Sequence, residues 1–307
     1  MHYVIGDVHE SYDEMISIME KIEKKDPKSE FIFVGDFIDR GNCTKKMLNW
    51  CMENITLDGK YQSVRGNHEN MILEWWKAWL RWWDTSENRH PWGDDMPRTV
   101  FGFSWALRCG YKTGTPEKIK PYIDFIEGLP LEKVITVRSI YGKDVTYRIA
   151  HADHCYETDA SELKKKYYNL WSYNYEGNNN NNEILVHGHF YTASDYFRNS
   201  YPKEEIRPGL IAYAENDINV DGGCAYDKYF WDVPCMLCAI CLENLEEIYL
   251  CSIEERFIQK RTRHSKKRRT STETAIKRAN EYSKRYLYKA LPSREALLER
   301  LKQVSQK

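Results

Sequence analysis

Five short polar segments, each following an apolar stretch, constrain the fold of this chain more than any other feature of its sequence. They are Gly6-Asp7-Val8-His9, Gly35-Asp36-Phe37-Ile38-Asp39-Arg40-Gly41, Arg65-Gly66-Asn67-His68-Glu69, His151-Ala152-Asp153 and His187-Gly188-His189. Each segment starts where a predicted β-strand ends. Ligands of open α/β sheets gather beyond the carboxyl ends of the strands, so these five segments can converge on one site.

The first 65 residues alternate apolar strands with helical patterns. Strands are predicted at 1–7, 31–36 and 61–65, and helices at 11–24 and 44–54. In the first helix, Ser11 followed by Glu14 forms the sequence pattern of a capping box, and apolar residues recur at helical spacing. The order strand, helix, strand, helix, strand predicts βαβ units and a parallel sheet.

Further along the chain, a tryptophan-rich stretch is followed by a strand-rich one. Seven of the ten tryptophans lie between Trp75 and Trp105, which predicts a helical insertion over about 70–130. Its aromatic face is interpreted as packing against the body, with a partner or substrate surface as the alternative. The later strands are predicted at 134–137, 145–151, 184–189, 218–221, 235–242 and 248–252.

Charge divides the chain into an acidic body and a basic tail. Residues 252–307 hold 17 Lys and Arg against 6 Asp and Glu, whereas the whole chain of 307 residues has a net charge of −1. We therefore predict a domain at 1–251 and a basic tail at 252–307 that ends in a short helix starting near Pro292. Three roles remain open for the tail: a solvated segment, docking on the acidic body or an acidic partner, and contact with nucleic acid.

Several features indicate a cytoplasmic protein. Nothing in the sequence approaches the roughly 18 apolar residues of a membrane span, and the N-terminus reads as a strand and not as a secretion signal. The nine cysteines are scattered through mostly apolar segments, which indicates reduced thiols. Cys235, Cys238 and Cys241 lie three residues apart on a predicted strand, so neighbours in this series face opposite sides and do not form a metal cluster.

The polar segments combine the ligand types that divalent ions prefer. Carboxylate, imidazole and amide oxygen donors together suit first-row ions such as Mn, Fe or Zn. An Asp carboxylate has two oxygens and can bridge two ions. Two ions about 3.5–4 Å apart clamp a phosphate and ionise a water molecule into a nucleophile at neutral pH. Asp7 and His9 are two residues apart in a segment expected to be extended, so their side chains should point the same way.

In these motifs the chain resembles the phosphoprotein phosphatase branch of the calcineurin-like metallophosphoesterases, especially its small bacterial and phage-type members. That branch has Gly-Asp-x-His-Gly, Gly-Asp-x-x-Asp-Arg-Gly, Gly-Asn-His-Glu, a later His, and Gly-His, and the match covers roughly 1–251. Diadenosine tetraphosphate hydrolases are close relatives with the same motifs. The resemblance implies an α/β fold, a four-layer α/β/β/α sandwich of two mixed sheets.

The resemblance also implies a ligand set for two divalent metal ions, with Mn expected first and Fe or Zn as alternatives. One ion would be held by Asp7, His9, Asp36 and His189, and the other by Asp36, Asn67 and His151. Asp36 would therefore bridge the two ions.

Catalytic roles follow from the same resemblance. His68 would protonate the leaving oxygen, with Asp39 orienting its ring. Arg40 and Arg65 would bind the phosphate oxygens, because a planar guanidinium can donate two parallel hydrogen bonds.

Three departures from the family pattern concern substrate recognition. Glu10 stands where the family usually has Gly, and Phe190-Tyr191 stands in place of the common Thr-Pro. Tyr173 occupies the position where many members place a further substrate-binding Arg. The set of metal ligands is intact.

The expected function is hydrolysis of phosphomonoesters, with phosphoserine and phosphothreonine in proteins as the favoured substrates, by in-line attack of metal-bound hydroxide. The site motifs supply only Arg40 and Arg65 as cations, and Glu10 adds a negative charge, which disfavours a polyphosphate. The alternative is a dinucleoside polyphosphate hydrolase, since the tryptophans could stack an adenine. A weaker alternative is a non-catalytic binding protein on a phosphatase scaffold.

Overall fold

The computed structural model describes residues 1–85, 109, 118–172, 182–194, 207–226, 235–251, 273, 277 and 292–302. Within these ranges the first sheet has the strand order β10-β9-β1-β2-β3. Its strands are β1 (His2–Ile5), β2 (Glu30–Phe33), β3 (Tyr61–Ser63), β9 (Met236–Cys241) and β10 (Glu247–Cys251). The first three strands are parallel, as predicted, whereas β9 is antiparallel to both β1 and β10.

The second sheet has the strand order β4-β5-β6-β8-β7. Its strands are β4 (Glu132–Arg138), β5 (Asp144–Ala150), β6 (Ile184–His187), β7 (Ala212–Ala214) and β8 (Asp217–Asn219). The central strands β5, β6 and β8 are parallel, and both edge strands are antiparallel to their neighbours. The strand β7 was not predicted from the sequence.

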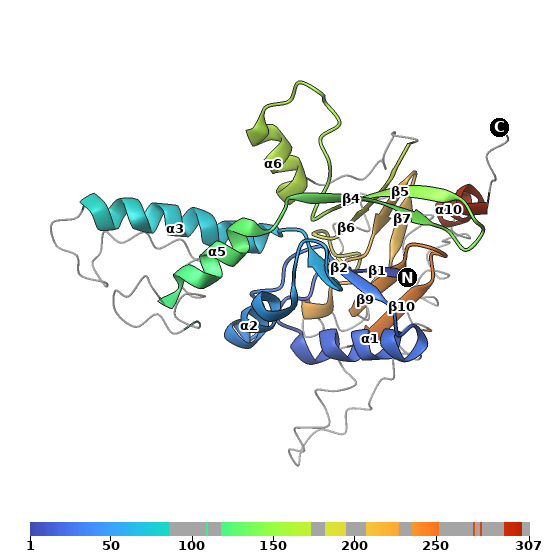
Figure 1. Ribbon diagram of the computed structural model, residues 1–307, viewed down its shortest axis with the longest axis horizontal. Helices are drawn as coiled ribbons and strands as arrows, with labels where there is room; N and C mark the ends of the chain where they lie inside the picture. The colour runs from blue at the N-terminus through green and yellow to red at the C-terminus, as the bar shows by residue number, and fades with distance from the viewer. Residues whose placement is uncertain are drawn as a thin grey trace, which may run out of the picture.

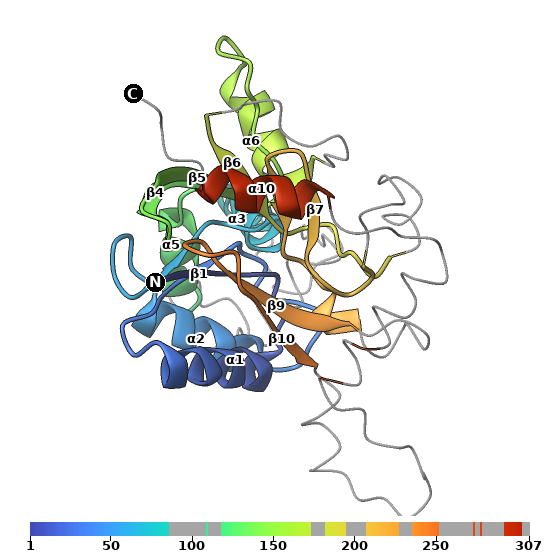
Figure 2. The same cartoon turned by 90° about the vertical axis from the view of Figure 1, so that its right-hand side faces the viewer.

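Helices flank the two sheets. They are α1 (Tyr12–Lys25), α2 (Thr44–Asn54), α3 (Asn67–Thr85), α5 (Lys120–Gly128), α6 (Glu162–Trp171) and α10 (Pro292–Lys302). Figures 1 and 2 show α1 and α2 below the first sheet, and α6 and α10 on the side of the second. The predicted four-layer sandwich of two mixed sheets is therefore confirmed. Among the described helices, none has the length and apolar character that crossing a membrane requires.

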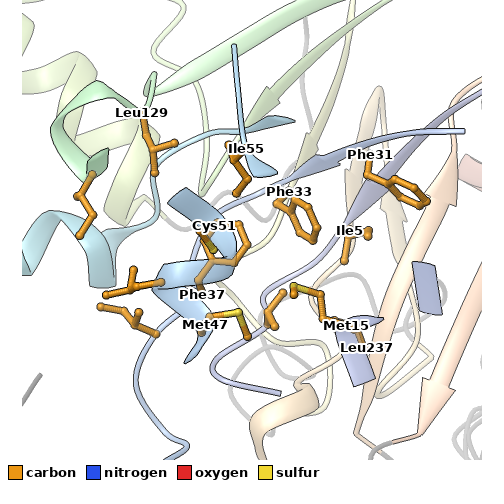
Figure 3. Packing of buried hydrophobic residues seen from close by; sticks show 14 of the residues in the cluster. Ile5, Met15, Phe31, Phe33, Phe37, Met47, Cys51, Ile55, Leu129 and Leu237 are labelled. Atoms are coloured by element: carbon orange, nitrogen blue, oxygen red, sulfur yellow. The ribbon is translucent and has the colours of Figure 1, made fainter. Parts of the chain in front are cut away.

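The core has two compartments, one on each face of the first sheet. Ile5 packs toward Met15 of α1 and Met47 of α2, as Figure 3 shows. Val4, the preceding residue, packs between the two sheets with Ile149 of β5. This alternation follows from the two-residue period of a strand. Each fully buried Ile, Val or Met side chain stabilises the fold by about 1.5–3 kcal/mol.

The cysteines of β9 follow the same alternation. Cys238 lies in the compartment between the two sheets, whereas Cys241 lies in the compartment between the first sheet and the helices α1 and α2. Both are free and fully buried, as is Cys235. Burial raises the pKa of Cys238 and raises that of Cys241 to about 12. The prediction of buried thiols on opposite faces is confirmed for these residues.

The predicted capping box at the start of α1 is wrong. Ser11 is the N-cap residue, but its side chain makes no capping hydrogen bond. Its backbone angles, φ −77° and ψ 61°, lie outside the extended conformation that an N-cap residue normally adopts. The acidic residues Asp13 and Glu14 still lie in the first turn, where the helix dipole favours negative charge.

The tryptophan-rich helix is α3, which extends with α5 from the body at the left of Figure 1. Trp75 and Trp79 are fully buried within the compartment that also holds Ile123 and Ile126 of α5. For these two tryptophans the packing interpretation is confirmed. The side chains of Trp82 and Trp83 and the remainder of the stretch up to Trp105 lie outside the described residues.

The short helix predicted near Pro292 packs on the fold. In α10, Leu297 and Leu301 are 2% and 0% exposed and join the compartment between the sheets. The hydroxyl of Ser139 donates to the carbonyl oxygen of Leu301 at 3.1 Å, and Arg294 donates to the carbonyl of Leu245 at 3.0 Å. Residues 292–302 are thus part of the fold and not an appendage. The boundary at 251 and the limits of the 70–130 insertion remain predictions.

Candidate metal centre

The five polar segments lie at the carboxyl ends of strands in both sheets. Asp7 and His9 follow β1, Asp36 follows β2, His151 follows β5 and His189 follows β6. Asn67, the sixth predicted ligand, starts α3 just after β3. The exposed fractions of Asp7, His9, Asp36, Asn67 and His151 are 2, 3, 1, 5 and 0%. The structure brings all six predicted metal ligands together at one edge of the sandwich.

The backbone is strained where these segments turn. Among the described residues, six of the eight non-glycine residues with positive φ lie here: His9, Glu10, Asp36, Asp39, Arg40 and His189. Each such residue costs roughly 1–2 kcal/mol relative to right-handed backbone. The expectation that Asp7 and His9 share an extended segment is wrong, because His9 has φ 44°. Strain of this kind persists only where the surrounding structure holds it, and it is concentrated at functional sites.

Two glycines allow the carboxylates to approach the backbone closely. A Cβ atom at Gly188 would lie 2.0 Å from Oδ1 of Asp7, and one at Gly66 would lie 2.2 Å from Oδ1 of Asp36. Any side chain at these positions would displace the carboxylates. Glycine is therefore required at these positions of the Gly-Asn-His-Glu and Gly-His motifs, because a larger residue does not fit.

Asp36 lies at the middle of the cluster. Its Oδ2 is 3.4 Å from Nε2 of His9, and its Oδ1 is 3.5 Å from Nε2 of His151. Ligand atoms lie within 4.8 Å of one another in two groups, which are His9, Asp36 and His68, and Asp7, Asp36 and His151. Asp36 is the member that both groups share, so it presents one oxygen to each side, as a bridging ligand must. The partition of the other ligands between two ions remains a prediction.

The amide of Asn67 completes one side of the cluster. One terminal atom of this amide lies 2.8 Å from Nε2 of His151 and 3.0 and 3.2 Å from the two oxygens of Asp36. If this atom is the amide nitrogen, it donates hydrogen bonds to His151 and Asp36. If it is the amide oxygen, it faces the position that a cation bound by His151 and Asp36 would occupy.

The ring nitrogens of the predicted ligands are suited to bind a metal. Burial lowers the pKa of His9 and His151, and it lowers that of His189 to about 3. Metals bind the neutral imidazole, so lowered pKa values keep these rings in the ligating form. In addition, Nδ1 of His9 contacts the carbonyl of Ile38 at 2.8 Å and that of His151 contacts the carbonyl of Val34 at 2.8 Å, which leaves each Nε2 directed at the cluster.

The carboxylates also fit a cation site. Burial and the nearby Asp221 and Asp36 raise the pKa of Asp7. Burial likewise raises the pKa of Asp221 to about 6. Buried negative charges at such short range repel one another, and divalent ions would offset that repulsion. The donor set and its charge therefore fit two divalent ions.

His68 differs from the other histidines of the cluster. Its Nδ1 lies 2.7 Å from Oδ2 of Asp39, and its Nε2 lies 3.8 Å from Oδ2 of Asp36. Burial acts to lower the pKa of His68, but the charge of Asp36 and the hydrogen bond with Asp39 raise it above its ordinary value. The ring is therefore biased toward the protonated form and directed at the cluster.

Arg40 reaches both sides of the site. Its guanidinium contacts Nε2 of His9 and lies 3.3 Å from Nε2 of His68. It also lies over the ring of Tyr226, 4.5 Å from the centroid, and Tyr226 stacks on Tyr191 with ring centroids 4.0 Å apart. Nε2 of His9 cannot contact this guanidinium and bind a cation at the same time. No signal in the sequence indicated the support from Tyr226.

The structure gives Arg65 other partners than the predicted phosphate. Its guanidinium donates to the carbonyl oxygens of Glu127 and Leu129 at 2.6 and 2.9 Å, at the C-terminal end of α5. Cations at a helix C-terminus satisfy the last carbonyl groups. The predicted phosphate contact of Arg65 is therefore not supported by this geometry. Tyr173, the other predicted substrate-binding residue, lies outside the described residues.

Comparison with known proteins identifies the family of this chain. The family model described as calcineurin-like phosphoesterase matches residues 3–222. The chain belongs to this family. This phosphoesterase is therefore a hydrolase acting on phosphoester bonds, and its two mixed sheets and its cluster of Asp and His ligands agree with that membership.

Relatives with known names match only short segments of this phosphoesterase. Serine/threonine-protein phosphatase T of Saccharomyces cerevisiae is 35% identical over 69 residues, which cover 22% of this chain and 13% of that protein. A symmetrical bis(5'-nucleosyl)-tetraphosphatase of Escherichia coli is 34% identical over 71 residues, which cover 23% of this chain and 24% of that protein. The crystal structure of a candidate diadenosine tetraphosphatase has a TM-score of 0.47 at 16% identity, covering 81% of this chain and 92% of that one.

In this phosphoesterase, Glu69 ties two site loops together. Its fully buried carboxylate accepts hydrogen bonds from the backbone N–H groups of Asp36 and Phe37, both at 2.9 Å, and of Gly66 at 3.0 Å. Burial and the charge of Asp36 raise the pKa of Glu69 to about 7. The sequence carried a signal, because Glu69 closes the Gly-Asn-His-Glu motif, but no role had been assigned to it.

Glu10 plays a different part from the one expected. Its carboxylate accepts hydrogen bonds from the N–H of Asp39 at 3.0 Å, from the N–H of Cys43 at 2.7 Å and from the hydroxyl of Thr44. Cys43 and Thr44 form the start of α2, where the helix dipole favours a negative charge. The charge of Glu10 therefore helps to position Asp39, and it does not count against a polyphosphate as the sequence had suggested.

Proposed function

We propose that this phosphoesterase hydrolyses phosphomonoesters, with phosphoserine and phosphothreonine residues of peptides as its substrate class. The proposal rests on one observation above all: the Asp39–His68 pair, 2.7 Å apart, lies directly beside the predicted bridging ligand Asp36. We further propose Mn²⁺ for the two ions, with Fe or Zn as alternatives, because carboxylate, imidazole and amide donors occur together. The residues that would hold them are Asp7, His9, Asp36, Asn67, His151 and His189.

Metal ions and side chains divide the chemistry between them. Two bound divalent ions would neutralise the phosphoryl group and supply a nucleophilic water at neutral pH. The guanidinium of Arg40 would donate paired hydrogen bonds to phosphoryl oxygens, a contact that is both strong and directional. The carboxylates of Glu69 and Glu10 accept backbone N–H groups of the loops that carry Asp36 and Asp39, so these groups would need little reorganisation during the reaction.

His68 would act as the general acid. Asp39 fixes Nδ1 of the ring, so the proton on Nε2 points toward the centre of the site. The leaving group of phosphoserine is an alkoxide, which departs poorly unless a proton reaches its oxygen. Donation from Nε2 of His68 would supply that proton, and Asp39 would stabilise the imidazolium and its orientation before the transfer.

The charges of the described residues favour a phosphomonoester over a dinucleotide. A polyphosphate chain carries several negative charges that need further cations. The guanidinium of Arg40 contacts His9 and His68 at the cluster, whereas Arg65 is bonded to carbonyl groups of α5 and Lys166 forms an ion pair with Glu74 at 3.0 Å. The second candidate function, dinucleoside polyphosphate hydrolysis, is favoured by one observation, an aromatic-lined groove beside the metal centre that could stack a base.

The role of His68 can be tested with two leaving groups. The variant His68→Asn should retain its metals, measured by elemental analysis, and lose about 10²–10⁴-fold in kcat on a phosphoserine peptide. The loss should be much smaller on p-nitrophenyl phosphate, whose leaving group barely needs a proton. His2→Asn, at the amino end of the central strand β1 and so at the opposite end of the strand from the site, is the matched control and should retain both activities. Equal losses of His68→Asn on both substrates would remove the general-acid role.

The substrate class can be tested on one enzyme preparation. The value of kcat/KM is measured for a panel of phosphoserine and phosphothreonine peptides and for diadenosine tetraphosphate. The proposal predicts the higher value on the best peptide. A tenfold preference for the dinucleotide, about 1.4 kcal/mol in transition-state binding, would instead select the second candidate function.

A further inference from the structure

Two stacked tyrosines lie beside Arg40 at the edge of the metal centre. The guanidinium carbon of Arg40 lies over the ring of Tyr226, 4.5 Å from its centroid. The ring of Tyr191 lies against the ring of Tyr226, with centroids 4.0 Å apart and planes at 22°. Tyr226 therefore contacts a cation and a second aromatic ring at the same time.

The fold fixes the position of this stack. Tyr191 comes from the loop after β6, and Tyr226 ends the short helix η2 (Cys224–Tyr226), which follows β8. The N–H of Thr192 donates to the carbonyl oxygen of Asp221 at 2.9 Å, which ties the two loops together. The stack is thus attached to the sheet that also carries two of the predicted metal ligands.

The stack gives a role to one departure from the family pattern. Phe190-Tyr191 stands where Thr-Pro is common, and a proline has no aromatic ring to place against Tyr226. Both tyrosines also pack against the buried residues Ala193 and Cys235. The second ring is therefore a feature of this sequence that the fold supports with buried side chains.

Arg40 is a residue whose placement needs such support. Its φ of 66° lies in the left-handed region, and ordering its long side chain costs conformational entropy. Its guanidinium contacts Nε2 of His9 and lies 3.3 Å from Nε2 of His68. Since Nε2 of His9 cannot contact the guanidinium and bind a cation at once, the ring of Tyr226 is a contact that does not compete with metal binding.

We propose that Tyr226, supported by Tyr191, is a positioning residue that holds the guanidinium of Arg40 in place for phosphoryl oxygens. This inference rests on the contact between Arg40 and the phosphoryl group in the proposed function. The face of an aromatic ring carries partial negative charge and attracts a guanidinium electrostatically. Unlike a carboxylate, the ring face does not occupy the N–H groups that would bind the anion.

Binding of inorganic phosphate to the metal-loaded protein, measured by calorimetry, tests this role without a cleavage step. Tyr226→Phe keeps the ring face and should stay within about twofold of the wild-type Kd, whereas Tyr226→Leu should bind about fivefold more weakly. Tyr191→Ala should weaken binding about twofold to threefold, because the supporting ring is lost. Tyr141→Ala, before the amino end of β5 and so remote from the site, is the matched control and should bind as the wild type does. The ring of Tyr141 also has a cation nearby, since Nζ of Lys302 lies 6.0 Å from its centroid.

A double-mutant cycle separates positioning from a general structural effect. In the Arg40→Ala background, Tyr226→Leu should change phosphate binding by less than about twofold, because the ring then has no guanidinium to hold. Equal losses in both backgrounds, or a loss in Tyr226→Phe as large as in Tyr226→Leu, would refute the positioning role. Weaker binding by Arg40→Ala with full binding by Tyr226→Leu would refute this inference and leave the proposed function standing. Full phosphate binding by Arg40→Ala would instead refute the proposed role of Arg40 and the inference with it.

Fluorinated rings in place of Tyr226 give a second measurement that preserves the shape of the side chain. Phenylalanine, monofluorophenylalanine and trifluorophenylalanine are similar in size, but fluorine withdraws electron density from the ring face and weakens its attraction for a cation. The Kd for phosphate should rise stepwise along this series, and the trend should vanish in the Arg40→Ala background. A Kd that stays constant along the series would overturn the proposal.

Discussion

Replacing Leu301 by alanine measures how firmly α10 is built into the fold. Leu301 is 0% exposed and packs in the compartment between the two sheets. Truncation of a fully buried leucine to alanine costs about 2–5 kcal/mol, and the lower part of that range applies where neighbours can relax. Because α10 lies at the periphery and can shift, we expect a loss of about 2–3 kcal/mol in the free energy of unfolding.

Urea denaturation can measure this loss. With a slope of about 2–3 kcal/mol per molar urea, the midpoint should fall by roughly 1 M. The same chemical change at Leu57, which is 63% exposed, is the control and should stay within about 0.5 kcal/mol of the wild type. Trypsin should also cleave after Arg294 and Arg300 of α10 faster in Leu301→Ala, since a weakly docked helix opens more often.

Two results would refute this reasoning. A midpoint for Leu301→Ala that equals that of Leu57→Ala would mean that α10 contributes no packing energy. An unchanged rate of tryptic cleavage in α10 together with a large global loss would mean that Leu301 acts through another part of the core. The first result would return residues 292–302 to the status of an appendage.

Two further predictions concern the metals and pH. Chelation of divalent ions should lower the melting temperature, because ligand atoms of Asp7 and Asp36 lie within 4.8 Å of each other, and two like charges about 4–5 Å apart repel by about 3–4 kcal/mol at an effective dielectric of about 20; an unchanged melting curve would contradict a preformed metal centre. His2 has a raised pKa owing to its hydrogen bond with Glu243, so its stabilisation is present below about pH 6.5 and is lost as pH rises through the higher folded value. Urea midpoints should therefore show wild type exceeding His2→Gln by more at pH 6 than at pH 8, and a constant difference would exclude this linkage.

The features predicted from the sequence were those that short segments determine by themselves. The strand at 1–7 could be predicted from its apolar run alone, and the observed alternation of Val4 and Ile5 between the two compartments requires only the two-residue period of a strand. The ligand roles of the six clustered residues are implied by the resemblance to a known family and remain predictions. Their meeting at one place could be predicted from the sequence because they lie beyond the carboxyl ends of strands, and parallel strands bring these ends together. Local pattern and sheet geometry were sufficient for these features.

The features that the sequence did not predict depend on partners distant in the chain. The direction of Arg65 is set by the carbonyl groups of Glu127 and Leu129, which another helix brings into reach. From the sequence, Glu10 was interpreted as an added negative charge at the site. In the structure its carboxylate accepts the N–H groups of Asp39 and of Cys43, the latter at the start of α2. In the same way, the aromatic-lined groove needs α6 beside α3, and no periodicity within either helix indicates that neighbour.

Because α10 packs on the fold, residues 252–291 are flanked on both sides by elements of the fold. Residues 252–291 run from Cys251, which pairs with Met236 in the first sheet, to Pro292 at the start of α10. Because both flanking residues belong to elements of the fold, a single cut within 252–291 would leave two pieces that remain associated through Leu297 and Leu301 until denaturant separates them.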